Sequence, residues 1–228
     1  SFKPSYGTVS RHGVVAFASS LDQVGPFARS VKDIAYVMDV ICKKDPLDAT
    51  NRGHEPNFVE SLENEAKDFK VGFMPSLFDT EGVSDEVRTK FFEARDELEK
   101  AGATIVEINL EYLADALSTY YIIGPAEAYS NLSCLDSVRY GYRSQDANTI
   151  DELQSFSRGE GFGDEVLRRI LLGAHFLSGE NYDTFFVPAT KLRTLIRKDF
   201  NSAFDTVDTI FMPTSPRTAF EFGEKSSP

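Results

Sequence analysis

The fold class is decided by residues 70–108, which read KVGFMPSLFDTEGVSDEVRTKFFEARDELEKAGATIVEI. Residues 71–74 are a short apolar run typical of a buried strand. Ser84 can cap a helix, and Gly102 supplies the left-handed residue that ends it. Residues 104–108 form the next apolar run. A strand, a helix and a strand in this order predict a βαβ unit with two parallel strands.

Outside this unit the sequence is mainly helical. Ser30 can cap a helix over residues 31–42, whose apolar side chains recur at helical spacing. A last buried strand is expected at 207–212, and short strand-like runs at 8–10 and 14–18. Further helices are expected at residues 110–121, 126–140, 163–176 and 188–204. We therefore predict an α/β fold, with a helical insertion covering the middle of the chain.

Composition limits the possible functions. The chain has 228 residues, is 41% hydrophobic and carries a net charge of −12. This charge repels phosphate backbones and anionic lipids, so autonomous nucleic-acid or membrane binding is not expected. No apolar run approaches the ~20 residues that a membrane-spanning helix needs. Cys42 and Cys134 are the two cysteines, and their wide separation indicates reduced thiols in a cytosol-like compartment.

General catalytic motifs are missing from the sequence, which has no GxSxG, SxxK, P-loop, GxGxxG or HExxH pattern. His12, His54 and His175 are scattered, whereas a metal site needs clustered ligands. Neighbouring acids such as Asp85 and Glu86 suit a solvated helix start better than a catalytic pair. These tests alone predict an α/β domain without identifying its chemistry.

The opening stretch, residues 2–26, reads FKPSYGTVSRHGVVAFASSLDQVGP. Its Lys-Pro turn and its ASSLDQ run resemble the amidase-signature family, and within it the glutaminase (A) subunits of tRNA-dependent amidotransferases. Shorter matches follow in the same order along nearly the whole chain. They include DPLDAT at 45–50, YYII at 120–123, SNL at 130–132, RRI at 168–170 and RTLI at 193–196.

The resemblance implies an amide hydrolase that uses a Lys–Ser–Ser triad, with backbone N–H groups forming the oxyanion hole. The family's triad lies in sequence that precedes Phe2, so no catalytic residue is expected in this chain. Lys3 belongs to the turn after the signature and is not the catalytic lysine. The resemblance implies that residues 1–228 form a single partial amidase domain, with a mixed sheet flanked by helices and a helical insertion. This domain is expected to lack the N-terminal catalytic signature and the C-terminal closing segment.

The resemblance also implies the biological reaction. A glutaminase subunit of this kind hydrolyses glutamine and supplies ammonia for converting Glu-tRNA(Gln) to Gln-tRNA(Gln), or Asp-tRNA(Asn) to Asn-tRNA(Asn), in translation. The expected partners are a B subunit, which uses ATP and Mg and carries most of the tRNA contacts, and a small C subunit. No cofactor and no membrane contact are expected for this chain. The expected compartment is the bacterial cytoplasm, or an organellar matrix in a eukaryote.

Three residues are candidates for substrate binding. By resemblance, Arg169 corresponds to the arginine that pairs with the α-carboxylate of glutamine, which a planar guanidinium suits. Tyr120 corresponds to a pocket tyrosine, with Tyr121 as the alternative register. Helical geometry alone does not separate Arg168 from Arg169. A surface ion pair is the competing interpretation for the arginines, and core packing is the competing interpretation for the tyrosines.

The chain departs from the family pattern at four positions, because Tyr129, Cys134, Leu135 and Ser137 replace the usual Ser, Arg, Phe and Gly. These changes bear on details of the pocket wall or of a contact between subunits. Two alternatives stay open: part of another amidase-signature hydrolase that acts on a small amide, and a non-catalytic binding domain derived from an amidase.

Overall fold

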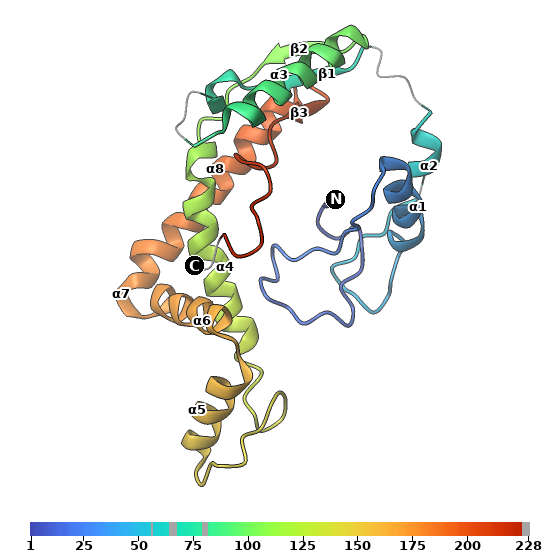
Figure 1. The fold of residues 1–228 in the computed structure, drawn as a ribbon. Coiled ribbons are helices and arrows are strands. Elements are labelled where there is room, and N and C mark those ends of the chain that lie inside the picture. Colours follow the sequence, from blue (N-terminus) through green and yellow to red (C-terminus); the bar gives the residue numbers. More distant parts are fainter. Residues whose placement is uncertain (56, 64–67, 79–81, 225–228) are drawn as a thin grey trace. The chain divides into compact units, whose positions relative to one another are not determined.

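The computed structural model describes residues 1–55, 57–63, 68–78 and 82–224. The chain divides into two compact units (Figure 1). The first unit is formed by Ser1–Asn64 and Asp115–Arg193, and the second by Glu65–Ala114 and Thr194–Pro228. Helix α8, Val187–Phe204, contributes residues to both units.

A parallel sheet forms the centre of the second unit. Its strand order is β2-β1-β3, and β1 pairs in parallel with both neighbours. The bounds are Lys70–Phe73 for β1, Thr104–Glu107 for β2 and Thr209–Phe211 for β3. The α/β class and the parallel pairing of the two strands that flank the predicted helix are confirmed. Both pairings among the described strands are parallel, so these strands do not form the expected mixed sheet. The last strand is shorter than the predicted 207–212, and it is only partly buried, so the expectation of a buried strand is wrong.

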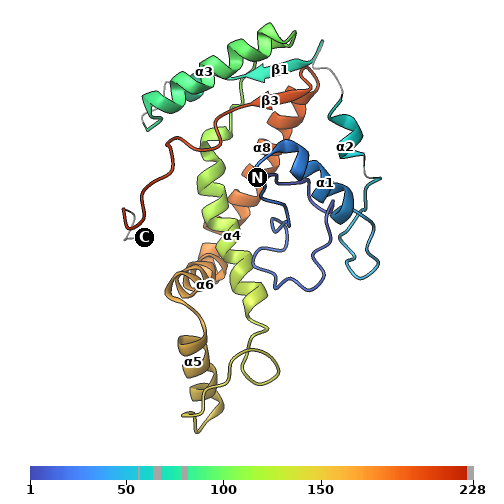
Figure 2. The same cartoon turned by 45° about the vertical axis from the view of Figure 1, so that its right-hand side comes forward.

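Helix α3, Asp85–Lys100, covers one face of the sheet (Figure 2). Phe91 on this helix stacks on Phe211 of β3, with ring centroids 4.2 Å apart and an interplanar angle of 8°. Phe73 of β1 belongs to the same buried cluster. The Ser84 side chain accepts a hydrogen bond from the backbone N–H of Val87 at 3.3 Å, as expected for an N-cap. The α3 helix and its cap are therefore where the sequence predicted them.

The second cluster of this unit comes from β1, β3, the segment after β2 and the end of α8. Met74, Leu110 and Ala203 are buried together, with Phe200 and Ile210 packed against them. Short 3₁₀ turns at Pro75–Phe78 (η1) and Leu113–Asp115 (η2) lead away from the strands. Leu110 is thus a core residue of an irregular segment, so the helix predicted at 110–121 begins too early.

The first unit opens with turns rather than strands. Residues 8–10 and 14–18 have no strand structure, so both strand-like predictions are wrong. Side chains satisfy the backbone polar groups instead. Asp22 accepts hydrogen bonds from the N–H groups of Phe17 and Ala18 at 2.8 and 3.0 Å, and Arg11 Nη1 donates to the Ser19 carbonyl at 2.7 Å.

Helix α1, Val31–Ile41, follows this segment, and α2, Phe58–Ser61, packs near it. Ser30 caps α1 by accepting from the N–H of Asp33 at 3.1 Å, as predicted. Met38 and Cys42 are buried at its inner face. Val31, which the predicted apolar stripe includes, is 71% exposed and does not join that core.

The remaining helices of the first unit differ from the prediction in one important way. Instead of separate helices at 110–121 and 126–140, a single helix α4 spans Ala116–Leu132 and contains Pro125. The other elements are α5 at Ile150–Gly161, α6 at Asp164–Leu177, α7 at Gly179–Asn181 and the π-helical η3 at Tyr182–Phe186. The α6 and α8 predictions are confirmed to within two residues. Helix α5 was not predicted from the sequence, because Gly159 near its end weakens the helical pattern.

Helices α4 and α6 pack closely because Gly173 has no side chain (Figure 1). A Cβ atom at Gly173 would lie 2.0 Å from the carbonyl oxygen of Pro125 and 2.7 Å from the Cβ of Tyr129. Pro125 removes one backbone donor from the α4 ladder, yet the helix continues through it. The buried contact with α6 stabilises this helical course against the proline's intrinsic preference.

A polar latch joins the N-terminal segment to α4 and α8. The N–H and Oγ–H of Ser20 donate to the two carboxylate oxygens of Glu127, at 2.9 and 2.5 Å. Arg193 then donates to the Ser20 Oγ at 2.6 Å and to its carbonyl oxygen at 3.2 Å. One turn further along α4, Asn131 donates to the Phe17 carbonyl oxygen at 3.1 Å. The loop 17–20 is therefore held against one stripe of α4.

Ser137 adopts a left-handed backbone with φ of 67° and is buried. The resemblance noted in the sequence implies that glycine is usual at this position. A side chain in this region costs about 1–2 kcal/mol. The Ser137 N–H bonds to the Tyr140 carbonyl oxygen at 2.9 Å, which holds the turn despite that strain.

We expect Gly173→Ala to destabilise the protein by about 1–3 kcal/mol, because the new methyl group overlaps the Pro125 carbonyl and forces the helices apart. Gly159→Ala is the matched control. Gly159 is also helical, but its Cβ would meet nothing within 4 Å, so this change should stabilise by about 0.5–1 kcal/mol. Urea unfolding measures both variants. Equal effects would contradict the close helix contact.

We also expect Ser20→Ala to destabilise by about 1–3 kcal/mol, since it leaves Glu127 and Arg193 without the hydroxyl that joins them. Ser133→Ala is the control, because the exposed Ser133 hydroxyl bonds to the Ser130 carbonyl of its own helix. The comparison uses urea unfolding under the same conditions. A loss no larger than that of the control would show that the latch contributes nothing.

Candidate functional site

The candidate site lies where α4 and α6 approach each other. Tyr120 and Tyr121 project from the first part of α4, with ring centroids 5.5 Å apart and an interplanar angle of 61°. Tyr120 is 41% exposed and Tyr121 is 47% exposed. Neither side chain is a core residue, so the core-packing interpretation does not describe them.

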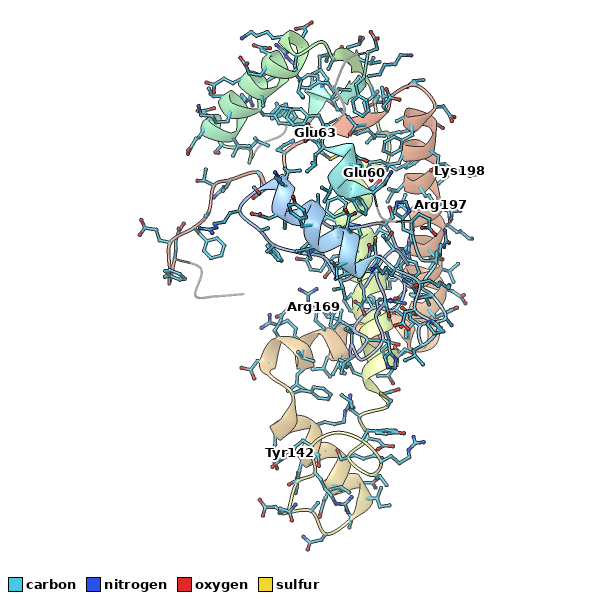
Figure 3. The ribbon with its side chains drawn as sticks, turned by 90° about the vertical axis from the view of Figure 1, so that its right-hand side faces the viewer. Glu60, Glu63, Tyr142, Arg169, Arg197 and Lys198 are labelled. Carbon is cyan, nitrogen blue, oxygen red and sulfur yellow. The ribbon has the colours of Figure 1, made fainter. Side chains whose placement is uncertain are left out.

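Arg169 lies on α6 (Figure 3), and its guanidinium contacts the ring of Tyr121 on α4. Its guanidinium carbon lies 5.3 Å from the centroid of the Tyr121 ring, which is within the range of a cation–π contact. Arg169 lies one turn before Gly173, and Tyr121 lies one turn before Pro125. The helix contact at Gly173 and Pro125 therefore sets the separation of Arg169 and Tyr121.

The guanidinium of Arg169 is only partly satisfied. Its Nε donates to Glu165 Oε1 at 2.7 Å. Its Nη1 is buried and has no hydrogen-bond acceptor among the residues that the structure describes. A buried donor of this kind is costly unless a partner accepts from it. The atom is suited to receive an acceptor from a bound molecule.

Charges at the site favour the ionised forms. The hydrogen bond from Arg169 lowers the pKa of Glu165, and the same bond raises the pKa of Arg169. The neighbouring tyrosines Tyr120 and Tyr121 make smaller contributions in the same direction on Arg169. The arginine is therefore a permanent positive charge against the ring of Tyr121.

Arg168 differs from its neighbour. Both arginines pair with Glu165, so the ion pair considered for them is present in each case; the Arg168 side chain is 45% exposed and makes no aromatic contact among those described. Arg169 is 21% exposed and faces the tyrosines. The structure thus separates two arginines that helical spacing alone did not. No role was predicted for Glu165, although its spacing of three and four residues from the arginines is a recognisable signal of ion pairs on a helix.

The polar latch lies on the same stripe of α4 as Tyr120. Tyr120, Gly124, Glu127 and Asn131 follow at steps of four, three and four residues, so they share one helix face. The Tyr120 ring packs over Gly124, where a Cβ atom would lie 3.1 Å from its Cε2 atom. Loop 17–20, bound to Glu127 and Asn131, therefore lies on the same face of α4 as Tyr120, about two to three helical turns further along.

This arrangement can bind an anion rather than carry out chemistry. A planar cation with a free donor suits a carboxylate, and the tyrosine rings provide apolar contact with a hydroxyl at the edge. Within the described ranges, no group of three or more His, Cys, Asp or Glu side chains could hold a metal ion. In the same ranges, no helix has the length and hydropathy to cross a membrane.

Comparison with known proteins identifies the family. The Amidase family model matches residues 2–228. The chain is 50% identical to the A subunit of glutamyl-tRNA(Gln) amidotransferase from Sulfurihydrogenibium sp., over 99% of this chain and 46% of that protein. It is 47% identical to the corresponding protein from Persephonella marina, over 98% of this chain and 46% of that protein.

A solved structure agrees with these relatives. The A subunit of glutamyl-tRNA(Gln) amidotransferase from Thermotoga maritima matches with a TM-score of 0.74 and 35% identity, over 99% of this chain and 44% of that one. The chain spans just under half the length of these relatives. The resemblance seen in the sequence is confirmed by these matches along nearly all of the chain: the chain belongs to the amidase family.

Proposed function

We propose that this chain is part of the glutaminase subunit of a tRNA-dependent amidotransferase, and that Arg169 binds the α-carboxylate of glutamine there. The relatives that match almost the whole chain are named as A subunits of glutamyl-tRNA(Gln) amidotransferases, which supports the reaction class. One structural observation carries the substrate assignment. The buried Nη1 of Arg169 lacks an acceptor among the described residues, beside the ring of Tyr121.

The binding mode follows from the chemistry of the two partners. A carboxylate accepts charge-assisted hydrogen bonds from the Nη atoms of a guanidinium in one plane. Tyr121 covers a face of that guanidinium and Tyr120 lies against Tyr121, so the aliphatic part of a small amino acid would contact aromatic rings. In this proposal Arg169 and the tyrosines bind and orient glutamine. The nucleophile comes from the family's Lys–Ser–Ser signature, outside residues 1–228.

The proposed partners are those of the amidotransferase. A B subunit would use ATP and Mg and would carry most of the tRNA contacts, and a C subunit would hold the other two together. The net charge of −12 supports this division, because an acidic chain does not attract tRNA by itself. The bacterial relatives support a role in translation in the cytoplasm. In this proposal the B subunit determines whether Glu-tRNA(Gln) or Asp-tRNA(Asn) is amidated, because it carries most of the tRNA contacts.

A different amidase-family hydrolase acting on a small amide is the second candidate. Such an enzyme shares the fold but does not require a carboxylate on its substrate. The unpaired donor of Arg169 favours glutamine over a neutral amide, because a neutral ligand would leave the charge unmatched. A purely non-catalytic domain would show no dependence of amide hydrolysis on this arginine.

In the assembled enzyme that contains this chain, we expect Arg169→Ala to raise the KM for L-glutamine by about tenfold to hundredfold, because the charge-assisted hydrogen bonds are lost. The KM for 4-aminobutanamide, which lacks the carboxylate, should change little. Steady-state ammonia release measures both. Arg139→Ala is the control, since Arg139 is 71% exposed and pairs with Asp136 at 3.2 Å. Equal effects on both amides would contradict the assignment.

The chain of residues 1–228 alone should release no ammonia from L-glutamine, since the expected triad lies outside it. The measurement compares the purified chain with the assembled amidotransferase at equal concentration. Ammonia release by the chain alone would place a nucleophile among its own residues and would overturn the assignment of the triad.

A further inference from the structure

Glu165 connects the two neighbouring arginines of α6. Its Oε1 accepts from Nε of Arg169 at 2.7 Å, and its Oε2 accepts from Nη1 of Arg168. The Glu165 side chain is 53% exposed, so it is itself a surface residue, while Arg169 is 21% exposed. The three side chains form a cluster at the first two turns of α6.

The position of Glu165 decides which edge of the Arg169 guanidinium is free. A guanidinium offers one edge with Nε and an Nη, and another with both Nη atoms. Glu165 takes the Nε position, and the buried Nη1 has no acceptor among the described residues. The Tyr121 ring contacts the guanidinium at 5.3 Å. Glu165 and Tyr121 therefore limit both the rotation and the plane of the group.

The charge of the cluster matches one further carboxylate. One carboxylate and two guanidinium groups give a net charge of +1. Arg168 offsets the charge of Glu165, so Glu165 can hold Arg169 without cancelling its attraction for an anion. Without Arg168 the pair would be neutral and would attract a carboxylate more weakly.

We propose that Glu165 is a positioning residue, which holds Arg169 by its Nε and so directs the free Nη edge to the substrate carboxylate. This inference rests on the proposed function, because it assumes that Arg169 binds that carboxylate. Glu165 touches no reacting atom in this account. It acts on the selectivity of the site for amides that carry a carboxylate, rather than on the rate of bond cleavage.

Two opposite effects make the proposal testable. If Glu165 orients Arg169, its loss disorders the guanidinium and weakens substrate binding. If Glu165 only competes for the positive charge, its loss strengthens substrate binding. The Glu165→Gln variant separates the two effects, since its side-chain amide oxygen can still accept from Nε of Arg169 while the negative charge is gone.

The experiment measures KM and kcat of the assembled enzyme for L-glutamine, with 4-aminobutanamide as the comparison substrate. We expect Glu165→Ala to raise the KM for L-glutamine about tenfold, with kcat within about twofold of the unchanged enzyme. Glu165→Gln should keep the KM at or below the original value. Neither change should alter kcat/KM for 4-aminobutanamide by more than about twofold.

Glu93→Ala is the matched control. Glu93 is 56% exposed and pairs with Lys90 on the exposed side of α3, in the other unit, so its removal tests the general loss of a surface ion pair. It should leave both KM values unchanged. Thermal unfolding of all variants establishes that they are folded. A normal KM in the Glu165→Gln variant distinguishes the loss of Arg169 orientation from a general loss of structure.

The outcomes separate the inference from the function on which it rests. If the unchanged enzyme uses both amides equally well and Arg169→Ala affects them equally, the proposed substrate contact fails. If Arg169→Ala is selective but Glu165→Ala leaves the KM for L-glutamine unchanged or lower, the positioning role of Glu165 is overturned while the function stands. A KM for L-glutamine that rises in the Glu165→Ala variant and returns to the original value in the Glu165→Gln variant supports the positioning role.

Discussion

The approach of α4 to α6 is the contact on which the candidate site depends. Gly173 brings the α6 backbone against the Pro125 carbonyl, at a distance that any side chain at this position would prevent. One helical turn away on each helix, the same approach sets Arg169 over the ring of Tyr121. The site is thus a consequence of backbone packing between two helices. No third helix or strand is needed to bring Arg169 of α6 and Tyr121 of α4 into contact.

Helix α4 also organises the N-terminal segment, which has no regular structure of its own before α1. Glu127 and Asn131 bind the loop 17–20 through its backbone groups and through Ser20. These bonds replace the ladder hydrogen bonds that a strand would have provided. Because Tyr120 lies on the same stripe of α4, the helix connects the loop and the site by one rigid element. The polar latch therefore has a structural role, which is to hold loop 17–20 against α4.

The charges at the site do not cancel, because two arginines, Arg168 and Arg169, share the single carboxylate of Glu165. Glu165 lowers the free charge of the two arginines but does not cancel it, and one donor of Arg169 stays without an acceptor among the described residues. A neutral, fully paired cluster would leave no donor without an acceptor, but it would attract a carboxylate more weakly. This departure from full pairing, at a point where aromatic rings and a helix contact converge, is typical of a binding site.

The sequence by itself determined the α/β class, the parallel pairing of β1 and β2, the capped helix α3, and the family, because these depend on local periodicity, caps and ordered motifs. It also pointed to Arg169, Tyr120 and Tyr121 through the resemblance, and their role in binding is still a prediction. Tertiary structure decided what local signals could not. Pro125 lies within one helix instead of ending it, since its burial against α6 outweighs its local preference. Likewise, β3 pairs with β1, and Arg168 and Arg169 differ in their surroundings, because only long-range packing determines which neighbours a residue meets.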